Sequence, residues 1–297
     1  TMFKKSKNSQ FFGSMGLIGA TIIWGFSFVV VKDSTASIPV PYLVAFRYIL
    51  ASAGMLLLFS FKLKELTFKV IKQGAVLGLF LCIGQFFQTL GCKYTTAGKN
   101  AFITTAYVIL VPFLCWIMEK KKPGSIQVVS AVIAIIGIGL LSLNGNMHIQ
   151  SGDFLTMICG IMLGFHIIYI DRYTRETDPV LLTMIQFMFA AIYIWTIIGV
   201  TRMPFPTQVF HPELFTKIMY IGLASTMMGF LLQIVCQKYT NPSVAAVILS
   251  MESVFGMLFS VIILHEKFTI KILIGCVCML IAVLLSELKG TQEEISV

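Results

Sequence analysis

Long apolar runs, separated by short polar stretches, fill most of the chain. A helix needs about 20 predominantly apolar residues to cross a hydrocarbon core about 30 Å thick. The runs are too long and too uniformly apolar for the strands of a membrane barrel, and an open sheet would leave backbone groups unpaired in lipid. The pattern therefore predicts an all-α membrane protein with ten transmembrane helices, at residues 12–31, 41–61, 74–94, 100–118, 125–143, 153–171, 180–200, 215–237, 243–264 and 269–287.

Short motifs recur in the same order in the two halves of the chain. Gly25–Phe26–Ser27 in the first predicted helix matches Gly164–Phe165–His166 in the sixth, and at the same offset Arg47 falls opposite Gln186. A further match closes the third and eighth helices, where Gln88-x4-Lys93–Tyr94–Thr95 is followed later by Gln233-x4-Lys238–Tyr239–Thr240. The shared order predicts the duplication of a five-helix unit.

Five helices per unit make the two repeats inverted, because an odd number of crossings starts the second repeat on the opposite side of the membrane. Inverted repeats are typical of transporters that work by alternating access around a central site. The predicted organisation is a cytoplasmic N-terminal tail, a first repeat, an external linker, a second repeat and a cytoplasmic C-terminal tail, at residues 1–11, 12–143, 144–152, 153–288 and 289–297.

The composition agrees with a chain surrounded by lipid. Hydrophobic residues make up 57% of the 297 positions and charged residues only 12%, whereas soluble domains carry about 25% charged residues. The net charge of +9 could suggest nucleic acid, but the basic residues form short clusters between apolar runs and offer no continuous face to a duplex. The chain is therefore predicted to bind the lipid bilayer and no nucleic acid.

The positions of the basic residues also predict an orientation. Lysines and arginines concentrate in loops on the cytoplasmic side of membrane proteins, and here they favour the side that holds the N-terminal tail, with clusters at Lys62, Lys64, Lys69 and Lys72 and at Lys120–Lys122. The prediction is a multi-pass protein of a plasma membrane, of the bacterial inner-membrane type, with both termini in the cytoplasm.

Motifs for catalysis, metal binding or nucleotide hydrolysis are absent from the sequence. The seven cysteines lie in or beside apolar runs without a CxxC pair, which indicates packing and not a metal site or a disulfide framework. The chain contains no Walker phosphate loop, no HExxH and no GxSxG. We therefore expect no catalytic residues, no metal and no cofactor, and a protein that is not an enzyme.

Several segments together resemble the EamA-type transporters of the drug/metabolite transporter superfamily. The similarity covers nearly the whole chain, in order Ile23–Trp24–Gly25–Phe26–Ser27–Phe28, Pro41 with Arg47, the stretch 95–104 followed by 107–112, and Ser250–Met251–Glu252 with His265–Glu266–Lys267. The resemblance implies ten helices in two inverted repeats around a substrate cavity, with amino acids, other metabolites or amphipathic drugs as cargo. One departure is Ser253, which follows Glu252 where the family commonly has proline.

Two charged residues lie well inside predicted helices. Arg47 falls within the second helix and Glu252 near the middle of the ninth. Charges in the bilayer interior are costly, and those that occur there commonly mark substrate or ion pathways. Arg47 is a candidate for binding a substrate carboxylate, and Glu252 for binding a substrate amine or a coupling proton. The alternative is that the two side chains pair with each other or hold helices in register.

Uncharged polar residues could complete a cavity lining. Gln85 and Gln88 are three residues apart and share a helix face, while Asn100, Thr104 and Tyr107 follow helical spacing along the fourth helix. Such groups also join membrane helices to one another through hydrogen bonds. The predicted substrate-binding residues are Trp24, Ser27, Arg47, Gln85, Gln88, Tyr107, His166, Gln186, Gln233 and Glu252. Glu266, near the outer end of the ninth helix, is expected to cap the tenth.

These features predict a secondary transporter, an exporter of amino acids or similar small metabolites that works by alternating access, with protons as coupling partners through Glu252. A monomer and a homodimer both fit the sequence. An alternative is an exporter of lipophilic cations or drugs, against which the positive charge of Arg47 argues. A membrane-embedded enzyme or accessory subunit is a distant alternative, because no catalytic constellation is present.

Overall fold

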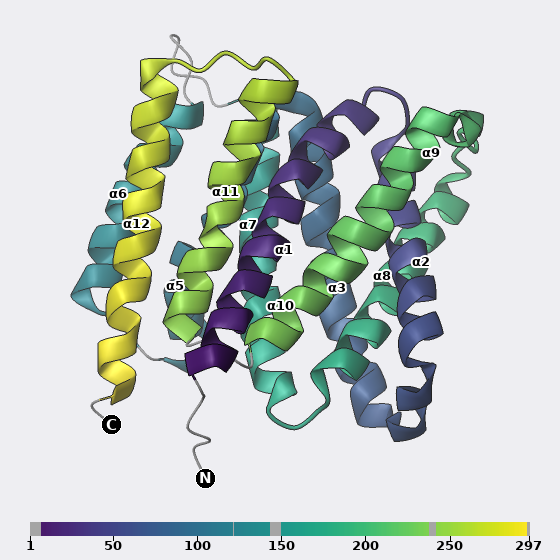
Figure 1. Cartoon of the computed structure of the whole chain (residues 1–297), viewed down its shortest axis with the longest axis horizontal. Coiled ribbons are helices and arrows are strands. Elements are labelled where there is room, and N and C mark those ends of the chain that lie inside the picture. Colours follow the sequence, from purple (N-terminus) through teal and green to yellow (C-terminus); the bar gives the residue numbers. More distant parts are fainter. Residues whose placement is uncertain (1–6, 121, 143–149, 238–241, 296–297) are drawn as a thin grey trace.

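The computed structural model describes residues 7–120, 122–142, 150–237 and 242–295, nearly all of them in helices and none in a strand (Figure 1). The first six residues of the predicted N-terminal tail, residues 144–149 of the predicted linker, and Lys238–Tyr239–Thr240 of the repeat motif lie outside this range. The elements are α1 (Lys7–Ser34), α2 (Val40–Phe59), η1 (Ser60–Glu65), α3 (Phe68–Tyr94), α4 (Ala97–Thr105), α5 (Tyr107–Glu119), α6 (Ser125–Ser142), α7 (Ser151–Thr174), α8 (Pro179–Thr201), η2 (Thr207–Phe210), α9 (Pro212–Met219), η3 (Tyr220–Met228), α10 (Gly229–Gln237), α11 (Pro242–Ile263) and α12 (Ile270–Ile295).

Six helical stretches are long and apolar enough to cross a membrane: Phe11–Ser34, Val40–Glu65, Phe68–Tyr94, Ser151–Thr174, Pro179–Thr201 and Pro212–Cys236. Four shorter apolar helices accompany them, at Ala97–Val111, Val128–Leu141, Ile248–Ile263 and Ile270–Leu285. The predicted all-α class is therefore confirmed for the described residues. The number of ten membrane-crossing helices stays a prediction.

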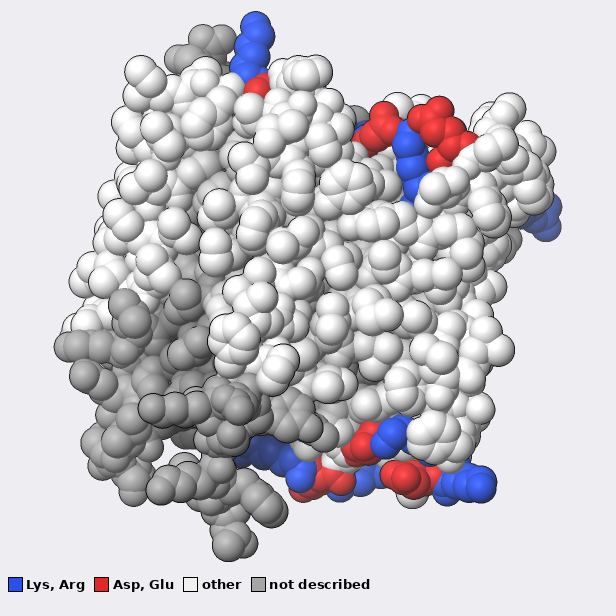
Figure 2. All heavy atoms as spheres, viewed as in Figure 1, with Lys and Arg blue, Asp and Glu red and all other residues white. Residues whose placement is uncertain are grey.

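The helices run alternately up and down one bundle (Figure 1). Helix α1 begins and α12 ends at the same end, which we name the terminal end, and α7 begins at the opposite end. On the face drawn in Figure 2, charged side chains gather at the two ends and a broad uncharged band separates them. This distribution suits a bundle whose middle lies in hydrocarbon and whose ends reach the two membrane surfaces.

Helix α3 begins before its predicted start. The apolar run predicts a helix over 74–94, whereas the helix starts at Phe68, one residue after Thr67, whose side chain accepts a hydrogen bond from the Val70 amide at 3.3 Å. Hydropathy marks only the lipid-embedded part of a helix. The threonine cap and two lysines, Lys69 and Lys72, extend the helix beyond the uniformly apolar run.

Two predicted helices are interrupted, which hydropathy alone does not reveal. The fourth divides at Ala106 into α4 and α5. The eighth consists of α9, the π-helical segment η3 and α10, and at the end of η3 the Gly229 amide bonds to the carbonyl oxygen of Ala224, five residues earlier. Such π-helical turns occur frequently at functional sites.

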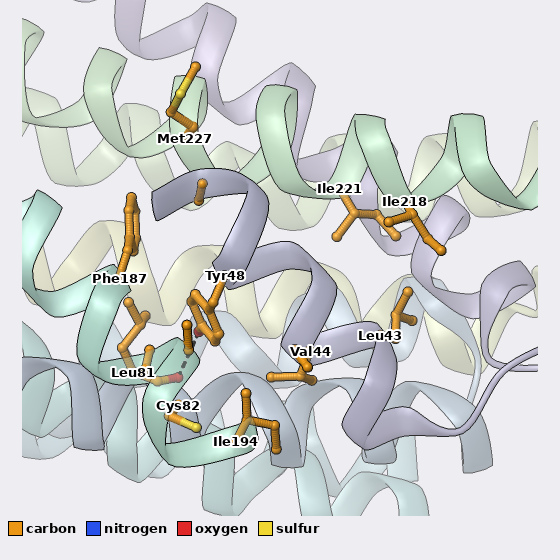
Figure 3. Close-up of a cluster of buried hydrophobic side chains, with 14 of the residues drawn as sticks. Leu43, Val44, Tyr48, Leu81, Cys82, Phe187, Ile194, Ile218, Ile221 and Met227 are labelled. Carbon is orange, nitrogen blue, oxygen red and sulfur yellow. Dashed lines mark hydrogen bonds between the residues drawn. The ribbon is translucent and has the colours of Figure 1, made fainter. Parts of the chain in front are cut away.

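The main apolar core joins helices of the two halves. Figure 3 shows Tyr48 of α2 between Leu81 of α3 and Phe187 of α8, all buried. The Tyr48 hydroxyl donates a hydrogen bond to the Leu81 carbonyl at 3.1 Å, so its one polar group is satisfied without water. Ile218 of α9 and Ile221 of η3 extend the cluster further.

Helix α1 packs closely on α11 because Gly25 lies at the contact. A Cβ atom added at Gly25 would stand 2.4 Å from the Phe255 Cβ and 2.9 Å from the Gly256 amide nitrogen. We expect Gly25→Ala to lower the free energy of unfolding by about 1–3 kcal/mol, the usual cost of overpacking, measured by denaturant titration in detergent. Gly19→Ala is the matched control on the same helix, since nothing lies within 4 Å of its added Cβ. Equal stability of the two variants would contradict this packing.

Glu266 caps a different helix from the one expected. Its carboxylate accepts hydrogen bonds from the backbone amides of Ala97 at 2.7 Å and Gly98 at 3.2 Å, so it caps α4 and not α12. The first amides of a helix have no partner within it and favour a negative group. Glu266 is 169 positions from Ala97 in the sequence, so local sequence patterns could not predict this contact.

The cap predicts a measurable loss on substitution. Glu266→Ala should lower the free energy of unfolding by about 0.5–2 kcal/mol, as removal of other helix caps does, again by denaturant titration. Glu65→Ala, at an exposed position of η1, is the control. If the two substitutions cost the same, Glu266 does not hold α4.

Candidate functional site

A cavity lies among helices from both halves of the chain. Its atom-free volume is about 780 Å³ when the solvent open to it is counted, and the enclosed part of this space is much smaller. Side chains of α1, α2, α3, α4, α5, α7, η3, α10 and α11 line it: Trp24, Ser27, Phe28, Val31, Arg47, Gln85, Gln88, Asn100, Thr104, Tyr107, Leu163, His166, Ile167, Ile170, Ser225, Phe230, Gln233 and Glu252.

The structure brings together nine of the ten residues predicted to bind substrate, all of them in the cavity lining: Trp24, Ser27, Arg47, Gln85, Gln88, Tyr107, His166, Gln233 and Glu252. The tenth, Gln186, is 1% exposed and lies behind the lining. Its Oε1 atom is 2.9 Å from Nε2 of His166. Gln186 therefore orients a lining residue and does not itself face the cavity.

Arg47 is held in place by neutral partners. Its Nε donates a hydrogen bond to Oγ1 of Thr226 at 3.0 Å, and Nη1 donates to Oε1 of Gln85. A guanidinium carries five N–H donors. Among the described residues no acceptor takes a hydrogen bond from Nη2, and no ion pair joins Arg47 to Glu252. The side chain thus combines a fixed orientation with donors and a positive charge at the cavity wall.

Glu252 lies on another wall of the same cavity. It is 6% exposed, and the hydroxyl groups of Tyr107 and Thr105 lie near its carboxyl group. A carboxylate among apolar helices requires such polar neighbours or a cationic ligand. The cavity lining therefore contains one basic and one acidic side chain that no ion pair joins.

The π-helical segment η3 supplies polar groups that sequence reasoning did not select. Thr226 accepts the bond from Arg47, and the Ser225 hydroxyl donates to Oγ of Ser27 at 2.8 Å. The Ser225 carbonyl accepts a hydrogen bond from Nε1 of Trp24 at 2.9 Å. The only sequence signal was a Ser–Thr pair inside an apolar run, which is common in membrane helices.

The remaining lining is apolar and aromatic. Trp24 packs edge-on against Phe230, with 5.4 Å between ring centroids, and Leu163, Ile167 and Ile170 of α7 add aliphatic surface. On another wall, Gln88 donates to Oγ1 of Thr104 at 3.3 Å. The lining therefore offers chemical partners for a solute with opposite charges and an apolar portion. In the part of the chain that the structure describes, no group of three or more His, Cys, Asp or Glu residues could hold a metal ion.

A family model of EamA-like transporters matches the chain twice, over residues 11–143 and 150–288. The chain belongs to the EamA-like transporter family. This agrees with the two-repeat architecture and with a cavity built from both halves, and it points to a transporter of a small-molecule substrate rather than to an enzyme. The resemblance drawn from the sequence motifs is confirmed.

Relatives and one solved structure extend this similarity over nearly the full length. An uncharacterized transporter of Archaeoglobus fulgidus is 32% identical over 284 residues, which cover 94% of this chain and 87% of the relative. The uncharacterized transporter YoaV of Bacillus subtilis is 19% identical over 300 residues, covering 95% and 98%. A crystal structure at 14% identity matches with a TM-score of 0.65 over 95% of this chain and 98% of that chain, which shows a shared fold.

Proposed function

We propose that this EamA-like transporter is a secondary exporter of amino acids or similar small amphipathic metabolites. Ten helices would cross the plasma membrane, and the two inverted repeats would alternate in giving the central cavity access to each side. The observation that carries the proposal is the separate placement of Arg47 and Glu252 in one cavity lining. Two side chains of opposite charge that do not pair with each other can each bind one charged end of a zwitterion.

Each end of such a substrate has a partner in the cavity. The guanidinium of Arg47 would bind the carboxylate, because charged N–H donors form the stronger hydrogen bonds to an anion. Glu252 would bind the ammonium group or carry the coupling proton. Trp24, Phe230 and Leu163 would contact the apolar side chain, which favours larger hydrophobic amino acids.

The orientation proposed from the sequence places the terminal end in the cytoplasm. The lysine cluster of η1 and the start of α3 lies at this end, together with the start of α1 and the end of α12 (Figure 1). Basic residues on the cytoplasmic side are the common rule. Export from the cytoplasm would then begin with the cavity open at the terminal end.

Transport in proteoliposomes tests the proposal. Vesicles preloaded with a panel of unlabelled amino acids and amines should exchange them for external radiolabelled L-phenylalanine with saturable kinetics, and protein-free vesicles are the control. Competition by amino acids but not by a quaternary amine supports the zwitterion. Competition by the quaternary amine alone would replace this substrate class with lipophilic cations, and no saturable flux for any member of the panel would refute it.

A further inference from the structure

Ion pairs join the two repeats at both ends of the bundle. At the terminal end, Lys62 of η1 pairs with Asp178 at 2.8 Å, and Lys69 of α3 pairs with Glu176. At the opposite end, Lys217 of α9 pairs with Asp33 of α1. In all three pairs the lysine and the carboxylate belong to different repeats. We name the first two pairs the terminal-end latch and the third the opposite-end latch.

The two latches occupy equivalent places in the inverted repeats. The terminal-end latch joins the start of the first repeat's third helix, α3, to the turn after the second repeat's first helix, α7. The opposite-end latch joins Lys217, in the last turn of α9 where the third helical stretch of the second repeat begins, to the last turn of α1, the first helix of the first repeat. The two latches therefore correspond in the helices that they join, although not in the paired positions themselves, since Asp33 matches Arg172 and Lys217 matches Lys72 at the offsets of the duplication.

Aromatic contacts along the same helix pairs follow the duplication as well. Phe26 and Phe165 are the matching residues of the duplicated Gly–Phe motif. Phe26 of α1 packs edge-on against Tyr220 of η3, with centroids 5.2 Å apart, and Phe165 of α7 stacks on Phe80 of α3 at 5.5 Å. The first helix of each repeat thus contacts the third helical stretch of the other repeat through an aromatic pair, and an ion pair from that helix or from the turn after it joins the same two repeats.

Separating the ion pairs of the latches requires little free energy, because the separated groups keep other partners or contact with water. Lys217 also pairs with Glu213 of its own helix, so it keeps a partner when Asp33 leaves. Asp178 accepts a hydrogen bond from the Leu181 amide at 2.9 Å, so its carboxylate stays satisfied at the start of α8 when Lys62 leaves. The lysine side chains of the three pairs are 20%, 60% and 26% exposed, so water can solvate the separated charges. Exposed pairs of this kind change a two-state ratio by up to about five-fold.

From this symmetry we infer that the two sets of ion pairs are alternating latches of the transport cycle. The terminal-end latch opens when the cavity opens to that end, while Lys217–Asp33 stays closed, and the reverse holds for the other half-cycle. The inference rests on the proposed alternating access, but it concerns the conformational equilibrium and not the substrate. Loss of one latch must therefore shift the whole molecule toward opening at that end and closure at the other.

Hydrogen–deuterium exchange of the full-length protein in lipid nanodiscs tests this without a substrate. The double variant Lys62→Gln with Lys69→Gln should raise deuterium uptake around residues 62–73 and 172–180 and lower it around 31–40 and 203–217. Lys217→Gln should give the opposite pattern. The population ratio implied by each pattern should move by up to about five-fold. Lys64→Gln, a change in the exposed part of η1, should leave both ends as in the unsubstituted protein.

The reciprocal change at the distant end separates a latch from a local structural contact. Uptake that rises only beside the substitution, with the other end unchanged, overturns the inference. The charge exchange Lys217→Asp with Asp33→Lys should restore the original pattern, and failure to restore it in a folded protein counts against the opposite-end latch in the same way. Reciprocal exchange in a protein that transports no amino acid would leave the latches standing and refute only the proposed substrate.

Discussion

Substitution of Arg47 by glutamine is expected to weaken the binding of an amphipathic amino acid by roughly 10- to 100-fold. A hydrogen bond to a charged group contributes about 1.5–3 kcal/mol, and each 1.4 kcal/mol is about ten-fold in affinity. Arg47→Gln removes the cation and also leaves Gln85 and Thr226 without their donor. Calorimetric titration of the purified protein with L-phenylalanine measures the loss.

Two comparisons make this prediction specific. Phenethylamine lacks the carboxylate, so its weaker binding should change little between the unsubstituted protein and Arg47→Gln. Arg202→Gln, at an exposed residue after α8, should bind L-phenylalanine normally. Equal losses for both ligands in a protein with unchanged thermal unfolding would mean that Arg47 shapes the cavity without contacting a carboxylate.

Substitution of Glu252 by glutamine should have the second large effect. The variant keeps the size and hydrogen-bonding capacity of the side chain, but it can neither carry a negative charge nor take up and release a proton. Binding of L-phenylalanine should fall by roughly 10- to 100-fold through loss of the charged partner of the ammonium group. Flux in proteoliposomes should also stop responding to an imposed pH gradient, because Glu252 is the proposed proton carrier.

Two readouts separate these roles of Glu252. Normal binding together with loss of the pH response assigns it to the proton alone, and the reverse result assigns it to the ammonium group alone. Glu65→Gln, at an exposed position of η1, is the control for a carboxylate outside the cavity. A Glu252→Gln protein that binds and responds to pH like the unsubstituted one would exclude both roles.

The sequence predicted the charged residues of the site because charge is rare inside apolar helices. Arg47 and Glu252 were selected on that ground and also lie in the motifs that carry the family resemblance, and both line the cavity. The internal duplication selected His166 and Gln186 as well, but it could not distinguish the residue that faces the cavity from the one that orients it. That difference depends on helix rotation, which repeat matching does not encode.

Features that depend on contacts between distant segments were missed. The π-helical register of η3 places Ser225 and Thr226 against α1 and α2, and hydropathy is the same for an α-helical and a π-helical segment. The Glu266 cap on α4 joins residues that are 168 and 169 positions apart. Local patterns predicted the helices, whereas their breaks and caps are set by tertiary packing.

The central claim is that one cavity, built by both repeats, binds a zwitterion between Arg47 and Glu252. The most direct measurement compares the binding of L-phenylalanine, phenethylamine and 3-phenylpropionate to the unsubstituted protein, Arg47→Gln and Glu252→Gln. The account predicts that Arg47→Gln removes the gain in affinity that the carboxylate gives L-phenylalanine over phenethylamine. It predicts that Glu252→Gln removes the gain in affinity that the ammonium group gives L-phenylalanine over 3-phenylpropionate. If both variants keep the ligand preference of the unsubstituted protein, this cavity does not recognise the substrate through these two residues.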